Sequence, residues 1–129
     1  MKILRPTDIE DEIRKALDEF FTVYVRPLPK NFSVPSLLIT ATGGTTANTV
    51  DTFTVTIDAR AETDAEADEL IRNAIGVLEN QAREQIGALR FVSLNALANW
   101  RTDPVRPELK MRTATAQVIA HREEYDFIN

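Results

Sequence analysis

The sequence contains no cysteine, and this absence removes several kinds of chemistry at once. Disulfide bonds, thiolate metal sites and cysteine nucleophiles are all excluded, and the lack of cysteine is compatible with a reducing compartment. The chain of 129 residues must therefore fold by packing alone. A chain of this length buries roughly two-thirds of the surface that its unfolded form exposes, so we expect one domain over residues 1–129.

Long apolar runs and clustered positive charge are also missing. The apolar stretches are only a few residues long, far short of the ~20 that a membrane helix needs, and the polar N-terminal residues argue against a secretion signal. Fifteen Lys and Arg against 20 Asp and Glu give a net charge of −5, which repels phosphate backbones and anionic lipids. The densest basic set is interrupted by Asp103 and Glu108, and we interpret it as a solvated loop. Its members are Arg101, Arg106, Lys110 and Arg112.

The first third of the chain predicts a helix, a strand and a stiff loop. Thr7 followed by Glu10 is a capping box, and the apolar spacing from Ile9 to Phe20 predicts a helix of about three turns. The β-branched and aromatic residues of 21–26 predict a short strand. The three prolines within 27–35 exclude a regular ladder there and predict an exposed loop.

Two strands joined at a glycine pair are expected next. Residues 36–42 and 52–61 have strand patterns, and the second alternates strictly between apolar and polar side chains. Gly43 and Gly44 between them predict a hairpin tip. A phosphate cradle is the alternative, but no lysine and no GK[ST] ending accompany the glycines.

A second, longer helix is predicted from the capping box Thr63 and Glu66 to about Gln85, before Gly87. Its early carboxylates suit the positive end of the helix dipole. They could also hold a metal ion, but hard cations favour ligands that converge from loops, so we interpret them as a capped helix start. These carboxylates are Asp64, Glu66, Asp68 and Glu69.

Two further strands and a tail complete the prediction. Residues 89–100 and 110–121 alternate as strands, and apolar residues on both sides of the first indicate that its second face is partly covered. Residues from about 122 to 129 predict a charged, mobile tail. The sum is an α+β fold of order αβββαββ, in which a mostly antiparallel sheet of four to five strands packs against two helices as a two-layer sandwich.

Candidate catalytic residues are few. His121 lies at the end of a predicted strand and could act as a general base only with partners from elsewhere in the fold. Asp58, near Arg60 and Glu62, could do acid or base work, but alternating charge on a solvated strand explains it more simply. None of the serines lies in a Gly-x-Ser-x-Gly elbow; they are Ser33, Ser36 and Ser93. We therefore predict no catalytic, cofactor-binding or metal site, and no enzyme.

The layout of the chain resembles the tail-terminator and tail-completion proteins of long-tailed bacteriophages. The resemblance covers most of the chain. It rests on the order of elements, on a strand that ends Ala-Arg-Ala-Glu-Thr at residues 59–63, and on the general residue pattern of 54–75 and 103–107. It implies a virion protein, assembled in the host cytoplasm, that forms a six-membered ring on the tail tube and joins the tube to the head connector. DNA then passes through the ring without specific binding.

A ring of identical subunits needs two different patches on each subunit. Our candidates are the second face of the sheet, the 27–35 loop and the 99–110 loop. The alternatives are another connector or tube protein of the same particle and, from a different class, a small enzyme or ligand-binding domain with a pocket around Trp100 and His121.

Overall fold

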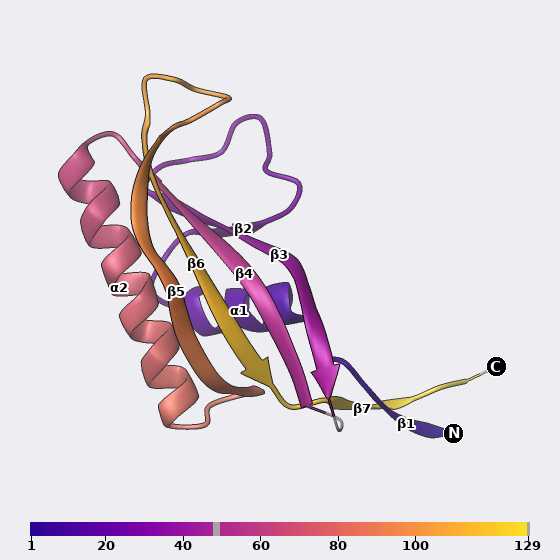
Figure 1. The fold of residues 1–129 in the computed structure, drawn as a ribbon. Helices are drawn as coiled ribbons and strands as arrows, with labels where there is room; N and C mark the ends of the chain where they lie inside the picture. The colour runs from indigo at the N-terminus through magenta and orange to yellow at the C-terminus, as the bar shows by residue number, and fades with distance from the viewer. Residues whose placement is uncertain (48–49, 129) are drawn as a thin grey trace.

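The computed structural model describes the backbone of residues 1–47 and 50–128, and the side chains of all of these except 96–99. The fold is α+β, with two helices and a mostly antiparallel open sheet among the described residues (Figure 1). The elements are β1 (Lys2–Arg5), α1 (Ile9–Leu17), β2 (Val23–Val25), β3 (Ser36–Ala47), β4 (Val50–Ala61), α2 (Asp64–Arg83), β5 (Leu89–Thr102), β6 (Lys110–Ala120) and β7 (Glu123–Asp126). The predicted order therefore recurs, with a short strand added before it and another after it.

Five strands form the main sheet in the order β2-β3-β4-β6-β5. The pairs β3–β4, β4–β6 and β5–β6 are antiparallel, and β2 pairs with β3 in parallel. Strand β5 is an edge of this sheet, and its pairing with β6 shifts register at three places along its length. The opposite edge is β2, which is only 3 residues long.

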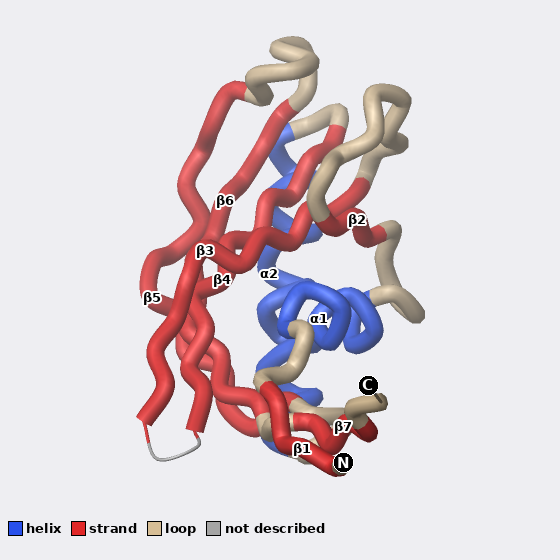
Figure 2. Tube along the Cα trace, turned by 90° about the vertical axis from the view of Figure 1, so that its right-hand side faces the viewer, coloured by secondary structure: helices blue, strands red, loops and turns tan. Residues whose placement is uncertain are grey.

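Both helices cover the same face of the sheet (Figure 2). The inward residues of β4 and β6 alternate as predicted, and small alanines on the strands let the helices approach closely. The centre of the core joins Ile13 and Leu17 of α1 to Ile71 and Leu78 of α2, all at most 1% exposed. Helix α2 begins as predicted, because the Thr63 hydroxyl accepts a hydrogen bond from the Glu66 amide at 3.2 Å.

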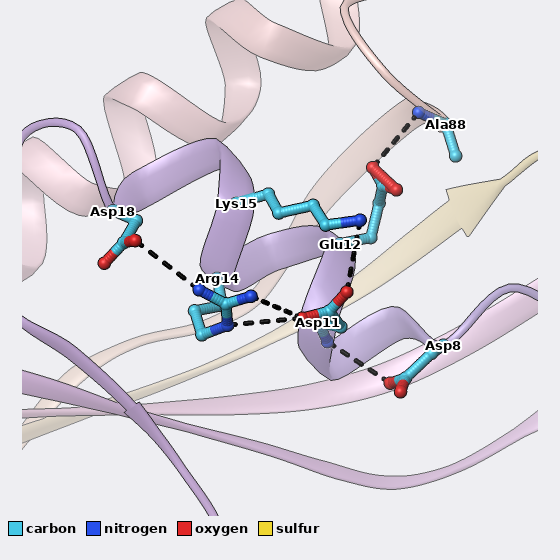
Figure 3. Close-up of polar contacts among 7 residues, drawn as sticks. All are labelled: Asp8, Asp11, Glu12, Arg14, Lys15, Asp18 and Ala88. Carbon is cyan, nitrogen blue, oxygen red and sulfur yellow. Dashed lines mark hydrogen bonds and ion pairs between the residues drawn. The ribbon is translucent and has the colours of Figure 1, made fainter.

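The N-cap of helix α1 lies one residue later than predicted. Asp8 is the N-cap, and its carboxylate accepts from the Asp11 amide at 3.2 Å (Figure 3). The Thr7 hydroxyl is directed elsewhere and donates to the carbonyl of His121. The helix also ends at Leu17, so Phe20 lies outside it and is 56% exposed.

Polar contacts stabilise α1 internally and link it to the segment before β5 (Figure 3). Arg14 donates to the Asp11 carboxylate at 2.6 Å, and Lys15 lies 3.2 Å from it. These two hydrogen bonds lower the pKa of Asp11 below its usual value. On the other side of the helix, Glu12 accepts from the Ala88 amide at 3.4 Å, which links α1 to the start of β5.

The glycine pair does not form the hairpin tip, so that prediction is wrong. Gly43 and Gly44 lie inside β3, opposite Thr54 and Phe53, next to a register shift between Ala41 and Gly43. The β3–β4 hairpin itself is present, but its strands continue past the glycines to Ala47 and Val50. Residues 48 and 49, between the two strands, lie outside the described residues.

The segment predicted as a charged, mobile tail contains a strand. Residues 123–126 form β7, which pairs with β1 in a separate two-stranded antiparallel sheet. We call this sheet the terminal ribbon. It extends away from the lower end of the main sheet, with both chain ends at its tip (Figure 1). Arg5 and Glu123 join its strands at 2.8 Å, and Arg5 stacks on the Tyr125 ring at 3.6 Å.

Candidate functional site

The second face of the main sheet is open over its lower part. No described helix covers it (Figure 2), and side chains from β4, β6 and β5 form cross-strand rows there. One row joins Thr54, Gln117 and Ser93, and the next joins Thr52, Ile119 and Phe91. Gln117 and Phe91 are exposed. We call this region the outer face.

The upper part of the same side is covered by two loops that pack against each other. Phe32 from the 27–35 loop is 2% exposed. The guanidinium of Arg106 stacks on its ring at 4.9 Å and donates to its carbonyl at 3.1 Å. The two loops predicted as separate assembly patches are therefore partly buried against one another.

A buried ion pair lies beneath these loops. Arg60 is the penultimate residue of β4. Its guanidinium donates to the Asp103 carboxylate at 2.9 Å, and the two side chains are 5% and 0% exposed. The other oxygen of Asp103 accepts from the Val105 amide at 2.9 Å. The prediction of solvated charge is wrong at Arg60, because the loops close over its side chain. In the basic set predicted to form a solvated loop, Arg101 and Lys110 are exposed and Arg106 and Arg112 are partly buried.

The proposed pocket around Trp100 and His121 does not exist as one site. Trp100 pairs with Arg112 near the start of β6, whereas His121 follows its last residue, so at about 3.3 Å per residue the two lie roughly 30 Å apart. A hollow of about 380 Å³ adjoins Trp100 and a separate groove of about 460 Å³ adjoins His121. The guanidinium of Arg112 stacks on the Trp100 ring at 3.5 Å.

The other candidate residues have ordinary partners. The Asp58 carboxylate accepts from the Thr113 hydroxyl at 2.7 Å, and the Ser33 hydroxyl lies 3.2 Å from that of Tyr24. Asp68 forms an ion pair with Arg72 at 3.0 Å on α2. Within residues 1–47 and 50–128, no three His, Asp or Glu side chains come together in a way that could hold a metal ion.

The groove beside His121 contains residues that the sequence patterns did not single out. Its apolar lining comes from Leu4 of the terminal ribbon, Val50 of β4 and Ile119 of β6. Arg90 and Arg122 line it with positive charge. These residues come from separate segments of the chain, so no local pattern in the sequence marks them as neighbours.

Arg122 is held in the groove by Asp51. Two hydrogen bonds of 2.9 and 3.0 Å join the guanidinium to the carboxylate, and Thr46 donates to the same carboxylate at 2.8 Å. The Arg122 hydrogen bonds, and to a smaller extent that of Thr46, lower the pKa of Asp51 below its usual value, although burial acts in the opposite direction.

We expect Asp51→Asn to flatten the acid dependence of stability. Because the folded pKa is depressed, the contribution of the carboxylate is complete above its unfolded pKa of about 3.9 and is lost as the pH falls through the folded value. Urea unfolding at several pH values should show wild type more stable than Asp51→Asn at pH 7 and the gap closing toward about pH 2. Arg122→Gln removes the cause of the shift and should flatten the profile in the same way, whereas a gap that is constant with pH would contradict the assignment.

Comparison of the chain with protein-family models and with curated proteins finds no match. Neither helix among the described residues is long and apolar enough to cross a membrane.

Proposed function

We propose that the protein is a structural subunit that assembles with copies of itself into a closed ring. Within that class, the proposed role is the tail terminator of a long-tailed bacteriophage, a virion ring of six copies that caps the tail tube and joins it to the head connector. The proposed particle is assembled in the host cytoplasm. The proposal gives the chain no enzymatic activity and no cofactor.

The observation that carries this proposal is the open outer face. A sheet with both helices on one side leaves its other side to solvent or to a partner. Here that side exposes Phe91 to 54% beside the partly buried Ile119. Apolar side chains that lie together on an exposed surface are typical of protein interfaces. The resemblance in element order, described above from the sequence, supports the phage assignment.

Net charge supports the part of the proposal that concerns DNA. Each subunit carries −5, so a ring of six would repel the phosphate backbone at long range. Weak attraction suits a conduit through which DNA slides, since phosphate contacts by Lys and Arg supply most of non-specific DNA binding.

The ring is tested by the solution mass of the purified chain. Light scattering over a range of concentrations should give a species near six times 14.5 kDa, about 87 kDa. Gln117→Arg on the outer face should weaken association by about tenfold or more, as expected for a large charge placed inside an interface. Glu79→Arg on the exposed side of α2 is the matched control and should leave the mass unchanged.

Two outcomes separate the alternatives. A monomer at every concentration would overturn the ring. If a ring forms, purified tail tubes should bind it at one end and stop growing. Binding along the whole tube, or only to the connector, would favour the alternative of another tube or connector protein.

A further inference from the structure

The terminal ribbon and the two residues that follow it expose apolar side chains that their own subunit does not cover. Leu4, Phe127 and Ile128 are 62%, 46% and 85% exposed. A two-stranded sheet without further packing is only marginally stable in water. Its apolar residues are therefore better explained by burial against a second surface than by the isolated subunit.

The groove beside His121 is the surface with matching chemistry. It has an apolar lining from Val50 and Ile119 and measures about 460 Å³. Arg122 and Arg90 add positive charge to a chain whose net charge is negative. Asp51 already pairs with Arg122, whereas Arg90 donates only to the carbonyls of Gly87 and Leu89 among the hydrogen bonds of the described residues.

Residues 123–128 carry the complementary pattern. Glu124 and Asp126 alternate with Tyr125 and Phe127, and Ile128 follows. Apolar side chains of this segment fit an apolar lining. Glu123 pairs with Arg5 and Asp126 with the N-terminal amine, so Glu124 is the carboxylate that suits the guanidinium of Arg90.

Residues 124–128 do not reach the groove of their own chain. The ribbon extends away from the main sheet (Figure 1), and Ile128 is 85% exposed and is not among the residues that line the groove. We propose that residues 124–128 of one copy dock into the groove lined by Val50, Arg90 and Ile119 of the next copy. Because none of residues 124–128 lines the groove, the segment and the groove are different patches, so the contact is head-to-tail and builds a ring when the rotation closes. This inference rests on the proposed ring and names two of its contacting surfaces.

The absence of cysteine allows a direct test by cross-linking. Ile128→Cys and Val50→Cys are made as separate variants, mixed in equal amounts as full-length chains, and oxidised with oxidised glutathione. We expect a disulfide-linked heterodimer at about tenfold higher yield than in a mixture of Ile128→Cys with Asn73→Cys, because docking raises the effective concentration of the two thiols. Asn73 is exposed on α2 and serves as the matched control.

A second variant tests the same contact without a covalent bond. The double change Phe127→Ser and Ile128→Ser removes exposed side chains only, so circular dichroism should report an unchanged fold while the mass by light scattering falls to that of one chain. Arg90→Glu should weaken the ring, and adding Glu124→Arg in the same chain should restore part of it.

The outcomes distinguish the two proposals. If wild type is monomeric at every concentration, both the ring and the docking are overturned. If wild type forms the ring but the ribbon variants do so equally well, and Ile128→Cys links no better to Val50→Cys than to Asn73→Cys, the docking is overturned while the ring stands. A third mixture pairs Ile128→Cys with Val77→Cys, whose position lies on α2. Preferential linkage in that mixture would place residues 124–128 against α2 instead and would also overturn the docking.

Discussion

Replacing Asp103 by alanine should lower the free energy of unfolding by about 3–5 kcal/mol, the cost typical of removing one partner from a buried ion pair. The Asp103 side chain is fully buried and lies 2.9 Å from Arg60, which is itself 5% exposed. The substitution leaves that guanidinium without its counter-charge and also removes the acceptor of the Val105 amide. Urea denaturation at neutral pH measures the change.

Two further variants show whether the loss comes from the unpaired charge. Glu108→Ala in the same loop removes a carboxylate that is 68% exposed and should change stability by no more than about 0.5 kcal/mol. Arg60→Met combined with Asp103→Leu removes both charges and should be less destabilising than Asp103→Ala alone. A loss for Asp103→Ala as small as that for Glu108→Ala would contradict the burial of the pair.

Gly44→Ala should destabilise the protein by about 1–3 kcal/mol, as overpacking at a close contact does. A Cβ at this position would lie 2.3 Å from the carbonyl oxygen of Thr52 on the paired strand. The contact is with backbone, so no side-chain rotation relieves it. The β3–β4 pairing would have to move, and thermal or urea unfolding should register the loss.

Gly76→Ala is the matched control and should have the opposite sign. Gly76 lies in α2, and a Cβ there would meet nothing within 4 Å. Alanine in an exposed helix interior is favoured over glycine by about 0.5–1 kcal/mol. If both substitutions shifted stability in the same direction, the close approach at Gly44 would not be the cause.

Local patterns in the sequence were sufficient for the elements that depend on neighbours along the chain. The alternation of β4 places Val55 and Ile57 in the core, and the capping pair Thr63 and Glu66 marks the start of α2. Both signals act within one strand or one helical turn. For this reason they predicted the α+β class and the order of the central elements.

Contacts between distant segments could not be read in the same way. The terminal ribbon pairs Ile3 with Tyr125, and neither strand is long enough to show a period. The burial of Arg60 depends on loops that close over it from elsewhere in the chain. Strand β2 runs parallel to β3 although only residues 26–35 connect them, a shorter connection than parallel pairs usually need.

Two other errors came from choosing between equivalent local signals. Thr7 and Asp8 are both good N-cap residues, and only the fold shows that the Thr7 hydroxyl is directed to the His121 carbonyl while Asp8 caps the helix. A glycine pair is as compatible with a strand irregularity as with a turn. The register of β3 against β4 decided that choice.

The edges of the main sheet affect how the subunit behaves at high concentration. An open sheet presents unpaired N–H and C=O groups at its two edge strands, and these can recruit strands from other molecules into aggregates. Strand β2 offers only 3 residues for such pairing. The long edge strand β5 shifts register between Leu89 and Phe91 and twice more before Asn99, which interrupts the flat ladder that a foreign strand would need. The sheet therefore resists uncontrolled fibre growth while leaving its face and its ribbon free for ordered contacts.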